Sequence, residues 1–206
     1  YSNPVLNNVA IYANTANQGG GIYSYHNTNP ILSNVSITNN TAEQGGSLYS
    51  QDVTSVNVIN TVLWNNVPQE IFLSGESDTI TVSYSNVQGG QDSIITNDNG
   101  TVNWGSGNID VDPMFVDTAN GDYNLLADSR LIDAGHPDST DADGTISDMG
   151  AYYYDQAGQP ARVSNLITTP SADNVSVRWN ANSAAASYNI YRSTDVSADF
   201  YSLSPY

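Results

Sequence analysis

The chain has 206 residues, no cysteine and no lysine, and its 21 acidic residues against four arginines give a formal net charge of −17. Without cysteine, neither disulfides nor thiolate metal sites can stabilise the fold. A strongly negative surface repels nucleic-acid backbones and anionic lipids, and no stretch is apolar for long enough to span a bilayer. Composition therefore argues against nucleic acid and membranes as partners, and it favours divalent cations and neutral or basic surfaces.

The first part of the chain contains a sequence repeat. Its copies are separated by a fixed offset, equal to the separation between Asn3 and Asn29. Each copy contains short runs rich in Val, Ile, Tyr and Thr between Asn, Gly and Asn-Pro, which is typical of strands and excludes helical repeats. A propeller blade needs about 40 residues and four strands, so three short strands per copy favour one coil of a parallel β-helix. The matching segments are 3–11 with 29–37 and 14–24 with 40–50; a third copy at 58–66 keeps this register, and a fourth at 79–87 is looser.

We therefore predict an all-β protein whose main part is a right-handed parallel β-helix, a solenoid. Residues 1–90 are expected to form its regular coils. The repeat dissolves into Gly, Asn, Asp and Ser from about residue 88, so residues 91–156 are expected to form an irregular closing coil and the C-terminal segment of the β-helix. Because the chain begins within the repeat, we expect it to be a fragment of a longer solenoid.

Residues 157–206 are predicted to form a linker and part of a β-sandwich. Residues 1–160 carry 18 of the 21 acids and one of the four arginines, whereas the remainder carries three of each sign, which indicates a domain boundary. Alternating runs at 160–167, 174–179 and 187–193 predict strands, with Val175, Val177 and Trp179 on one face of the sheet.

Equivalent residues of successive coils are expected to stack roughly 4.8 Å apart. Asn8, Asn34 and Asn60 then form a column at a tight turn, because asparagine tolerates left-handed backbone geometry and its amide can both donate and accept from coil to coil. We interpret this column as a turn ladder. The glycines at 19–21 and 45–46 are expected to occupy a tight bend with positive φ, as glycine permits, and not a phosphate-binding loop.

Tyr23 and Tyr49 are equivalent positions of two coils, so their rings are expected to stack in one column. An aromatic column on a flat β face can bind sugar rings, and it can equally pack against a loop or the core. These two tyrosines are therefore candidate ligand-binding residues.

The best candidate for a metal site is the sequence Asp141-Ala-Asp143-Gly, with Asp148 shortly after it. Closely spaced carboxylates around a glycine turn supply the oxygen ligands that Ca²⁺ prefers. The pattern is not a complete EF-hand loop, because Gly150 stands where the bidentate acid would be. The alternative interpretation is a solvated acidic turn that closes the β-helix.

No catalytic residues are predicted. Lyase chemistry at uronic acids needs a base such as Lys or Arg, and the arginine of the β-helix portion, Arg130, lies outside the regular coils. His26 and His136 are isolated in expected loops, and no Ser, His and Asp set occurs at motif spacing. Glycoside hydrolysis needs two facing carboxyls, but no two acids of the coils fall at the same or neighbouring positions of adjacent copies: Glu43, Asp52, Glu70, Glu76 and Asp78.

Five short motifs follow one another along residues 3–155: a Gly-rich coil at 18–23, an Asn-rich strand at 61–66, Asp-Pro-x-Phe at 112–115, Ile-Asp-Ala-Gly at 132–135 and Asp-Met-Gly-Ala at 148–151. In number and order they resemble the C-terminal part of bacterial secreted right-handed parallel β-helix proteins of the choice-of-anchor Q type. Leu131 departs from that pattern, where Ala is usual, and this affects packing only. The resemblance implies a secreted or surface-anchored protein and no established reaction.

The segment around 160–193 resembles the opening strands of a fibronectin type III module, with Trp179 at its core position. About half the length of such a module is present.

The expected function is that of a non-catalytic structural or adhesive segment of a secreted or cell-surface bacterial protein that contacts polysaccharide. The repeat, the acidity and the lack of a catalytic set favour it. The alternative is an accessory C-terminal part of a β-helix polysaccharide lyase or glycoside hydrolase whose catalytic coils lie upstream. Lys, Arg and paired Asp at stacked positions of an upstream sequence would favour that alternative.

Overall fold

The structure is a computed structural model, and it describes residues 2–97, 100–157, 164–171, 174–180 and 188. The chain divides into two compact units, Tyr1–Asp155 and Gln156–Tyr206. Each is described by itself.

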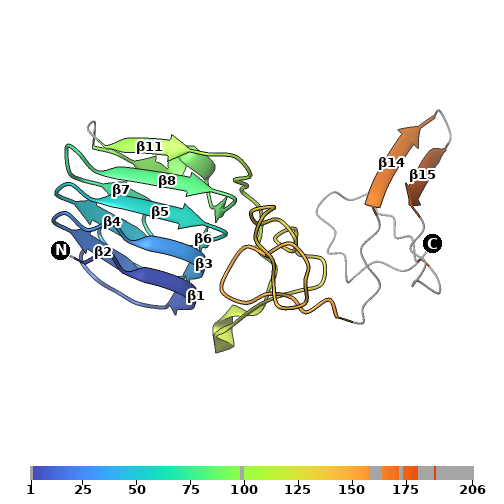
Figure 1. The fold of residues 1–206 in the computed structure, drawn as a ribbon, viewed down its shortest axis with the longest axis horizontal. Coiled ribbons are helices and arrows are strands. Elements are labelled where there is room, and N and C mark those ends of the chain that lie inside the picture. Colours follow the sequence, from blue (N-terminus) through green and yellow to red (C-terminus); the bar gives the residue numbers. More distant parts are fainter. Residues whose placement is uncertain (1, 98–99, 158–163, 172–173, 181–187, 189–206) are drawn as a thin grey trace. The chain divides into compact units, whose positions relative to one another are not determined.

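The first unit contains a right-handed parallel β-helix, which confirms the predicted fold (Figure 1). In the larger sheet, β1 pairs with β3, the start of β3 pairs with β5 and its end pairs with β6. β8 and β11 extend the sheet beyond β5, and β9 extends it beyond β6. The strands of this sheet are β1 (Val5–Tyr12), β3 (Ile31–Thr38), β5 (Ser55–Ile59), β6 (Val62–Trp64), β8 (Thr79–Ser83), β9 (Asn86–Val87) and β11 (Thr101–Trp104).

A smaller parallel sheet has the order β10, β7, β4, β2. Its strands are β2 (Ile22–Tyr25), β4 (Leu48–Gln51), β7 (Ile71–Leu73) and β10 (Ile94–Ile95), with the short 3₁₀ helix η1 (Gly90–Ser93) before the last. Ile22 lies opposite Leu48, as the fixed offset of the repeat predicts. The later coils are shorter, since Ser55 lies opposite Thr79 and Thr79 opposite Thr101.

The predicted asparagine corner is present. Asn8 and Asn34 have φ values of 55° and 52° inside β1 and β3, and the chain bends there so that each strand contributes to two faces. In the next coil, Asn60 has a φ of 50° and separates β5 from β6. Tyr84 takes the same left-handed conformation after β8, although a bulky side chain rarely does so.

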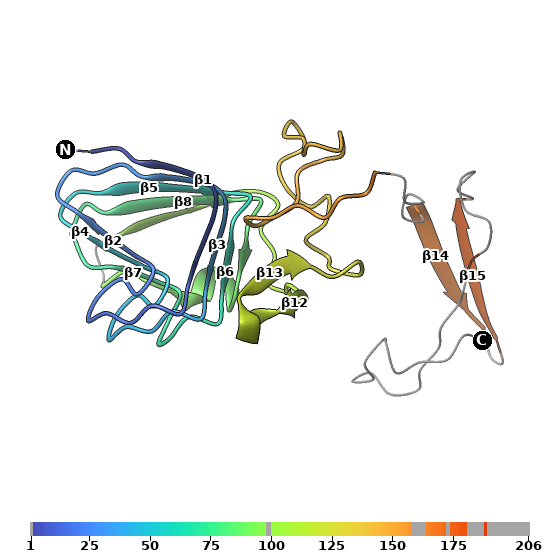
Figure 2. The same cartoon turned by 90° about the horizontal axis from the view of Figure 1, so that it is seen from below.

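Stacked aliphatic side chains fill the interior of the coils. Leu32, Val58 and Val82 lie in register on successive strands and are fully buried, as are their counterparts in the smaller sheet, Leu48 and Ile71. In Figure 2 successive coils overlie one another around this common interior. Each added coil therefore buries one apolar layer against the last, which is how a solenoid obtains stability from its neighbours.

The segment after β11 folds back over the outer face of β6. It contains the antiparallel pair β12 (Phe115–Asp117) and β13 (Asp122–Leu125), which the 3₁₀ helix η2 (Thr118–Asn120) connects. Its apolar residues form a second core with outward-pointing Val62: Leu125, Leu131, Ile132 and Met149. We call residues 105–155 the closing segment. No helix in the part of the chain that the structure describes has the length and hydrophobicity needed to cross a bilayer.

The second unit contains an antiparallel pair, β14 (Ser164–Pro170) and β15 (Val175–Asn180). These strands correspond to the first two of the three predicted there. The third expected strand, 187–193, lies outside the described residues except for Tyr188. The Tyr188 ring meets the Trp179 ring edge to face, with centroids 5.3 Å apart.

The glycine bends are confirmed in part. Gly19 and Gly45 have φ values of 61° and 63°. The prediction of a positive φ is wrong for the glycines that follow them, Gly20, Gly21 and Gly46. Those glycines are needed for close stacking instead, since a Cβ on Gly20 would lie 2.6 Å from the Gly46 carbonyl oxygen.

Replacement of Gly45 by alanine tests this bend. A Cβ there would lie 2.3 Å from the Leu48 carbonyl oxygen, in addition to the unfavourable φ. We expect Gly45→Ala to lower the free energy of unfolding by about 3 kcal/mol or more in a urea titration. Gly90→Ala is the matched control, because Gly90 has a φ of 61° with no neighbour within 4 Å of the added carbon. Gly90→Ala should lower the free energy of unfolding by only about 1 kcal/mol. Equal losses in the two variants would contradict the steric argument.

Candidate functional site

A ladder of asparagines runs through the coils at positions 14, 40 and 66, and its members Asn40 and Asn66 are buried. The Asn14 side chain donates to Asn40 Oδ1 at 2.9 Å, and the Asn40 side chain donates to Asn66 Oδ1 at the same distance. The backbone N–H groups of Asn14 and Asn40 donate to the same two oxygens. The sequence showed the register of these residues, but it pointed to the column of Asn8, Asn34 and Asn60 as the ladder.

Glu70 ends this ladder. The Asn66 side chain donates to Glu70 Oε2 at 2.7 Å, and its backbone N–H donates to Oε1 at 3.1 Å. Glu70 is only 3 % exposed. Burial raises the pKa of its carboxyl from 4.5 to about 7, because desolvation of the charged form outweighs the two hydrogen bonds from Asn66. Glu70, which the sequence showed only as an acid without a second acid at a neighbouring position, is therefore an internal structural group.

The raised pKa of Glu70 predicts a loss of stability as pH rises. The folded protein holds this proton up to about pH 7, whereas the unfolded chain releases it near 4.5, so the contribution is complete below 4.5 and is lost as pH rises through 7. We expect Glu70→Gln to reduce the difference in unfolding free energy between those two pH values by about 2 kcal/mol, measured by urea titration. Glu76→Gln removes the same charge from an exposed site of the same coil, and should leave the difference unchanged. An identical pH dependence in wild type and Glu70→Gln would contradict the assignment.

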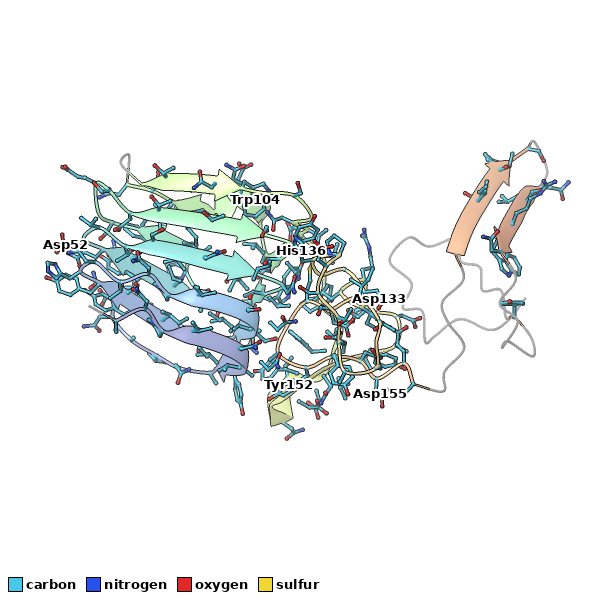
Figure 3. The ribbon with its side chains drawn as sticks, viewed as in Figure 1. Asp52, Trp104, Asp133, His136, Tyr152 and Asp155 are labelled. Atoms are coloured by element: carbon cyan, nitrogen blue, oxygen red, sulfur yellow. The ribbon has the colours of Figure 1, made fainter. Side chains whose placement is uncertain are left out.

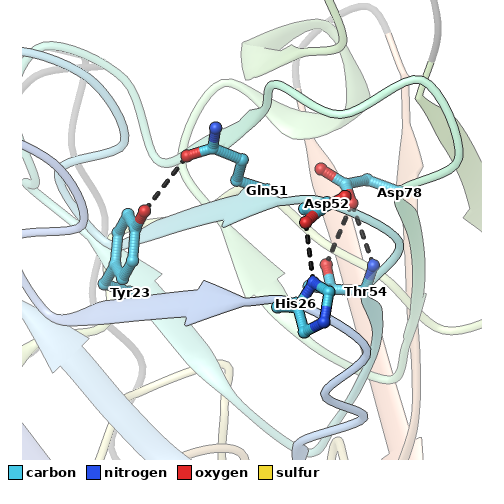
Figure 4. Close-up of polar contacts among 6 residues, drawn as sticks. All are labelled: Tyr23, His26, Gln51, Asp52, Thr54 and Asp78. Carbon is cyan, nitrogen blue, oxygen red and sulfur yellow. Dashed lines mark hydrogen bonds and ion pairs between the residues drawn. The ribbon is translucent and has the colours of Figure 1, made fainter.

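A second polar corner lies where β2 and β4 end (Figure 4). His26 Nδ1 lies 2.8 Å from Asp52 Oδ2, and both side chains are about half exposed. Asp78 is fully buried and accepts hydrogen bonds from the backbone N–H groups of Thr54 and Gly75 at 2.9 and 2.7 Å. His26 is thus a loop residue, as predicted, and Asp78 also accepts the Thr54 hydroxyl, at 3.3 Å.

The expected stack of Tyr23 on Tyr49 is confirmed. Their ring centroids lie 5.4 Å apart with an interplanar angle of 7°, and Phe72 continues the stack beyond Tyr49 at 5.5 Å and 8°. Phe72 was not among the predicted residues, because the shorter third coil obscures its register. Neighbouring rings cover both faces of Tyr49, which is 4 % exposed, whereas Tyr23 is 47 % exposed in this chain. Of the two candidates, only Tyr23 presents a ring to solvent.

The acidic turn uses its carboxylates within the protein. Asp148 is 1 % exposed, and its two oxygens accept the backbone N–H groups of Asp133 and Tyr154 at 2.7 and 2.6 Å. Burial raises the pKa of Asp148 to about 6, and the neighbouring Asp141 and Asp133 charges add to this effect. Asp141 accepts the Asp148 N–H at 2.7 Å, and Asp143 accepts the N–H and hydroxyl of Thr145. Burial also raises the pKa of Asp141.

Both oxygens of Asp148 accept N–H donors, and the described ranges contain no group of three or more His, Cys, Asp or Glu placed to hold a metal ion. Calcium binding by Asp141, Asp143 and Asp148 stays a prediction.

The calcium prediction has a direct test. A ligand bound only by the folded state must raise the melting midpoint, so calcium at Asp141, Asp143 and Asp148 requires a higher midpoint in millimolar calcium than in EDTA. Asp143→Asn should then abolish the rise, and Asp138→Asn, at an exposed position of the same segment, should preserve it. An unchanged midpoint in wild type contradicts the prediction.

The outward asparagine corner holds the closing segment in place. The Asn34 side chain donates to the Asp148 carbonyl oxygen at 3.0 Å, and Asn60 Oδ1 accepts the His136 N–H at 2.7 Å. The bond between the two amides is longer, at 3.4 Å. Asn8, Asn34 and Asn60 are therefore a corner column as predicted, but the amides of Asn34 and Asn60 mainly anchor residues far away in the sequence, which no local pattern could reveal.

A groove of about 780 Å³ with a mixed polar and apolar lining lies between this corner and the closing segment. Asn7, Asn8, Ser33 and Asn34 line one side, and residues 139–142 and 150–153 contribute to the other. Figure 3 shows Tyr152, Asp133 and Asp155 in the closing segment, away from Asp52. Sequence analysis did not find this groove, because its two sides lie far apart in the chain.

Comparison with known proteins adds no family assignment. No protein-family model, no curated protein and no solved structure matches the chain.

Proposed function

We propose that this chain is a non-catalytic structural and adhesive segment of a secreted or cell-surface bacterial protein, of the choice-of-anchor Q type and followed by a fibronectin type III-like module. The observation that carries the proposal is the continuous in-register stack of coils with its internal polar ladders. Such a stack is a stiff rod, and each coil presents its outward side chains at a fixed spacing. This suits a protein part that provides length and display.

The state of the acids supports a non-catalytic role. A hydrolytic pair needs two carboxyls facing one substrate bond. Glu70, Asp78 and Asp148 are instead buried and accept hydrogen bonds from backbone N–H groups, so they serve the fold.

Tyr23 is the proposed contact for polysaccharide in this role. Its ring stacks on Tyr49 and lies beside the Tyr25 ring, and its hydroxyl donates to Gln51 Oε1 at 3.0 Å, which fixes the ring orientation. A flat, half-exposed and oriented ring offers an apolar surface to the face of a sugar.

Binding to insoluble polysaccharides tests the proposed function. We expect wild type to be retained on at least one member of a panel of cell-wall polysaccharides without releasing sugars, and Tyr23→Ala to weaken retention about three- to tenfold. Tyr23→Phe keeps the ring and should bind like wild type. Ile95→Ala, which shortens an exposed side chain next to Phe72 in the same sheet, is the control. Release of unsaturated or reducing sugar, or no retention on any member, would contradict the proposal.

A further inference from the structure

We infer that the groove between the asparagine corner and the closing segment is a binding site for a neutral oligosaccharide. This inference assigns a site and a ligand class to the adhesive role, so it rests on the proposed function. It does not depend on Tyr23, which lies on β2 in the smaller sheet, while the groove is lined by β1, β3 and the closing segment.

The groove is held open by hydrogen bonds between its two sides. Asn34 donates to the Asp148 carbonyl oxygen, the Ala151 N–H donates to Ser36 Oγ at 2.9 Å, and the Gly150 N–H donates to the Asn60 carbonyl oxygen at 2.8 Å. Gly150 has a φ of 112°, and a Cβ there would lie 2.9 Å from Ser36 Oγ, so this close approach requires glycine. A cavity whose sides are fixed in this way needs little reordering when a ligand enters.

The lining has the chemistry that sugars require. Side-chain amides and hydroxyls from both sides can each donate and accept, as can the hydroxyls of a sugar. Tyr152 and Tyr153 are each 42 % exposed and add apolar ring surface. The volume of about 780 Å³ lies within the range of small-molecule sites, which is about 300–1,000 Å³.

Charge selects among sugars. Asp141 and Asp155 line the groove, and no Lys or Arg is among the described residues that line it. Uronic acids and sulfated sugars would bring a negative charge to these carboxylates without a cation to offset it, which is unfavourable. A neutral oligosaccharide avoids this repulsion and can donate its hydroxyl protons to the carboxylates.

Isothermal titration calorimetry with soluble oligosaccharides tests the groove. The probes are hexasaccharides of glucose (β-1,4 and α-1,4), of xylose and of mannose, with oligogalacturonate as the anionic comparison. We expect at least one neutral probe to bind and oligogalacturonate not to bind. Tyr152→Ala and Tyr153→Ala should each weaken binding about three- to tenfold. Ile95→Ala, which truncates a side chain of the same exposed fraction, 42 %, in the smaller sheet, should leave the affinity for the soluble probe unchanged.

The outcomes separate the two proposals. Wild-type retention on insoluble polysaccharide without binding of any neutral probe overturns the groove and preserves the proposed function. Equal binding of oligogalacturonate, or unchanged affinity in both the Tyr152→Ala and Tyr153→Ala variants, also overturns the groove. Thermal melts of each variant show whether it is folded. If a Tyr→Ala variant is unfolded, Tyr152→Ser and Tyr153→Ser replace it, and binding at wild-type strength by both folded substitutes overturns the site.

Discussion

Satisfaction of polar groups inside a repeating stack is the constraint on which this structure depends. In a column of identical asparagines, each amide donates to the oxygen of the asparagine in the next coil. The last amide has no such neighbour and needs a different hydrogen-bond acceptor. Glu70 is such a group, since a carboxyl offers two oxygens to the Asn66 N–H and amide. Asp78 does the same for Thr54. The two acids therefore mark where the regular repeat gives way to shorter coils.

The sequence predicted the parts of this fold that repeat. A fixed offset between matching strings determines strand pairing, and Asn8, Asn34 and Asn60 could be placed at a left-handed corner because few other residues tolerate that backbone. The stacking of Tyr23 on Tyr49 could be predicted because the same offset places them at equivalent positions of two coils. The burial of Glu70 could not be predicted, because a glutamate shortly after Asn66 is equally compatible with an exposed loop.

The long-range contacts of the closing segment could not be predicted from the sequence either. Asn34 and Asp148 are 114 positions apart, and nothing in either local pattern couples them. The acidic turn illustrates the consequence: spacing alone suggested calcium ligands, whereas the fold supplies backbone N–H donors to the same carboxylates. Calcium-binding loops and hydrogen-bonded turns both use closely spaced Asp residues, so the spacing alone does not distinguish them. The distinction depends on which backbone N–H groups lie near the carboxylates.

The asparagine corner also explains why a groove forms where it does. The amides of a corner column repeat at the spacing of the coils, roughly 4.8 Å, and each points outward with the same chemistry. Asn34 and Asn60 are engaged by the closing segment, whereas Asn8 lines the groove together with Asn7. The repeat supplies a row of equivalent amides, and the closing segment forms hydrogen bonds with only part of that row. The remaining amides form one side of the groove, and the tyrosines of the closing segment lie on the other. Amides and aromatic rings on facing sides are the arrangement that the proposed sugar-binding site requires.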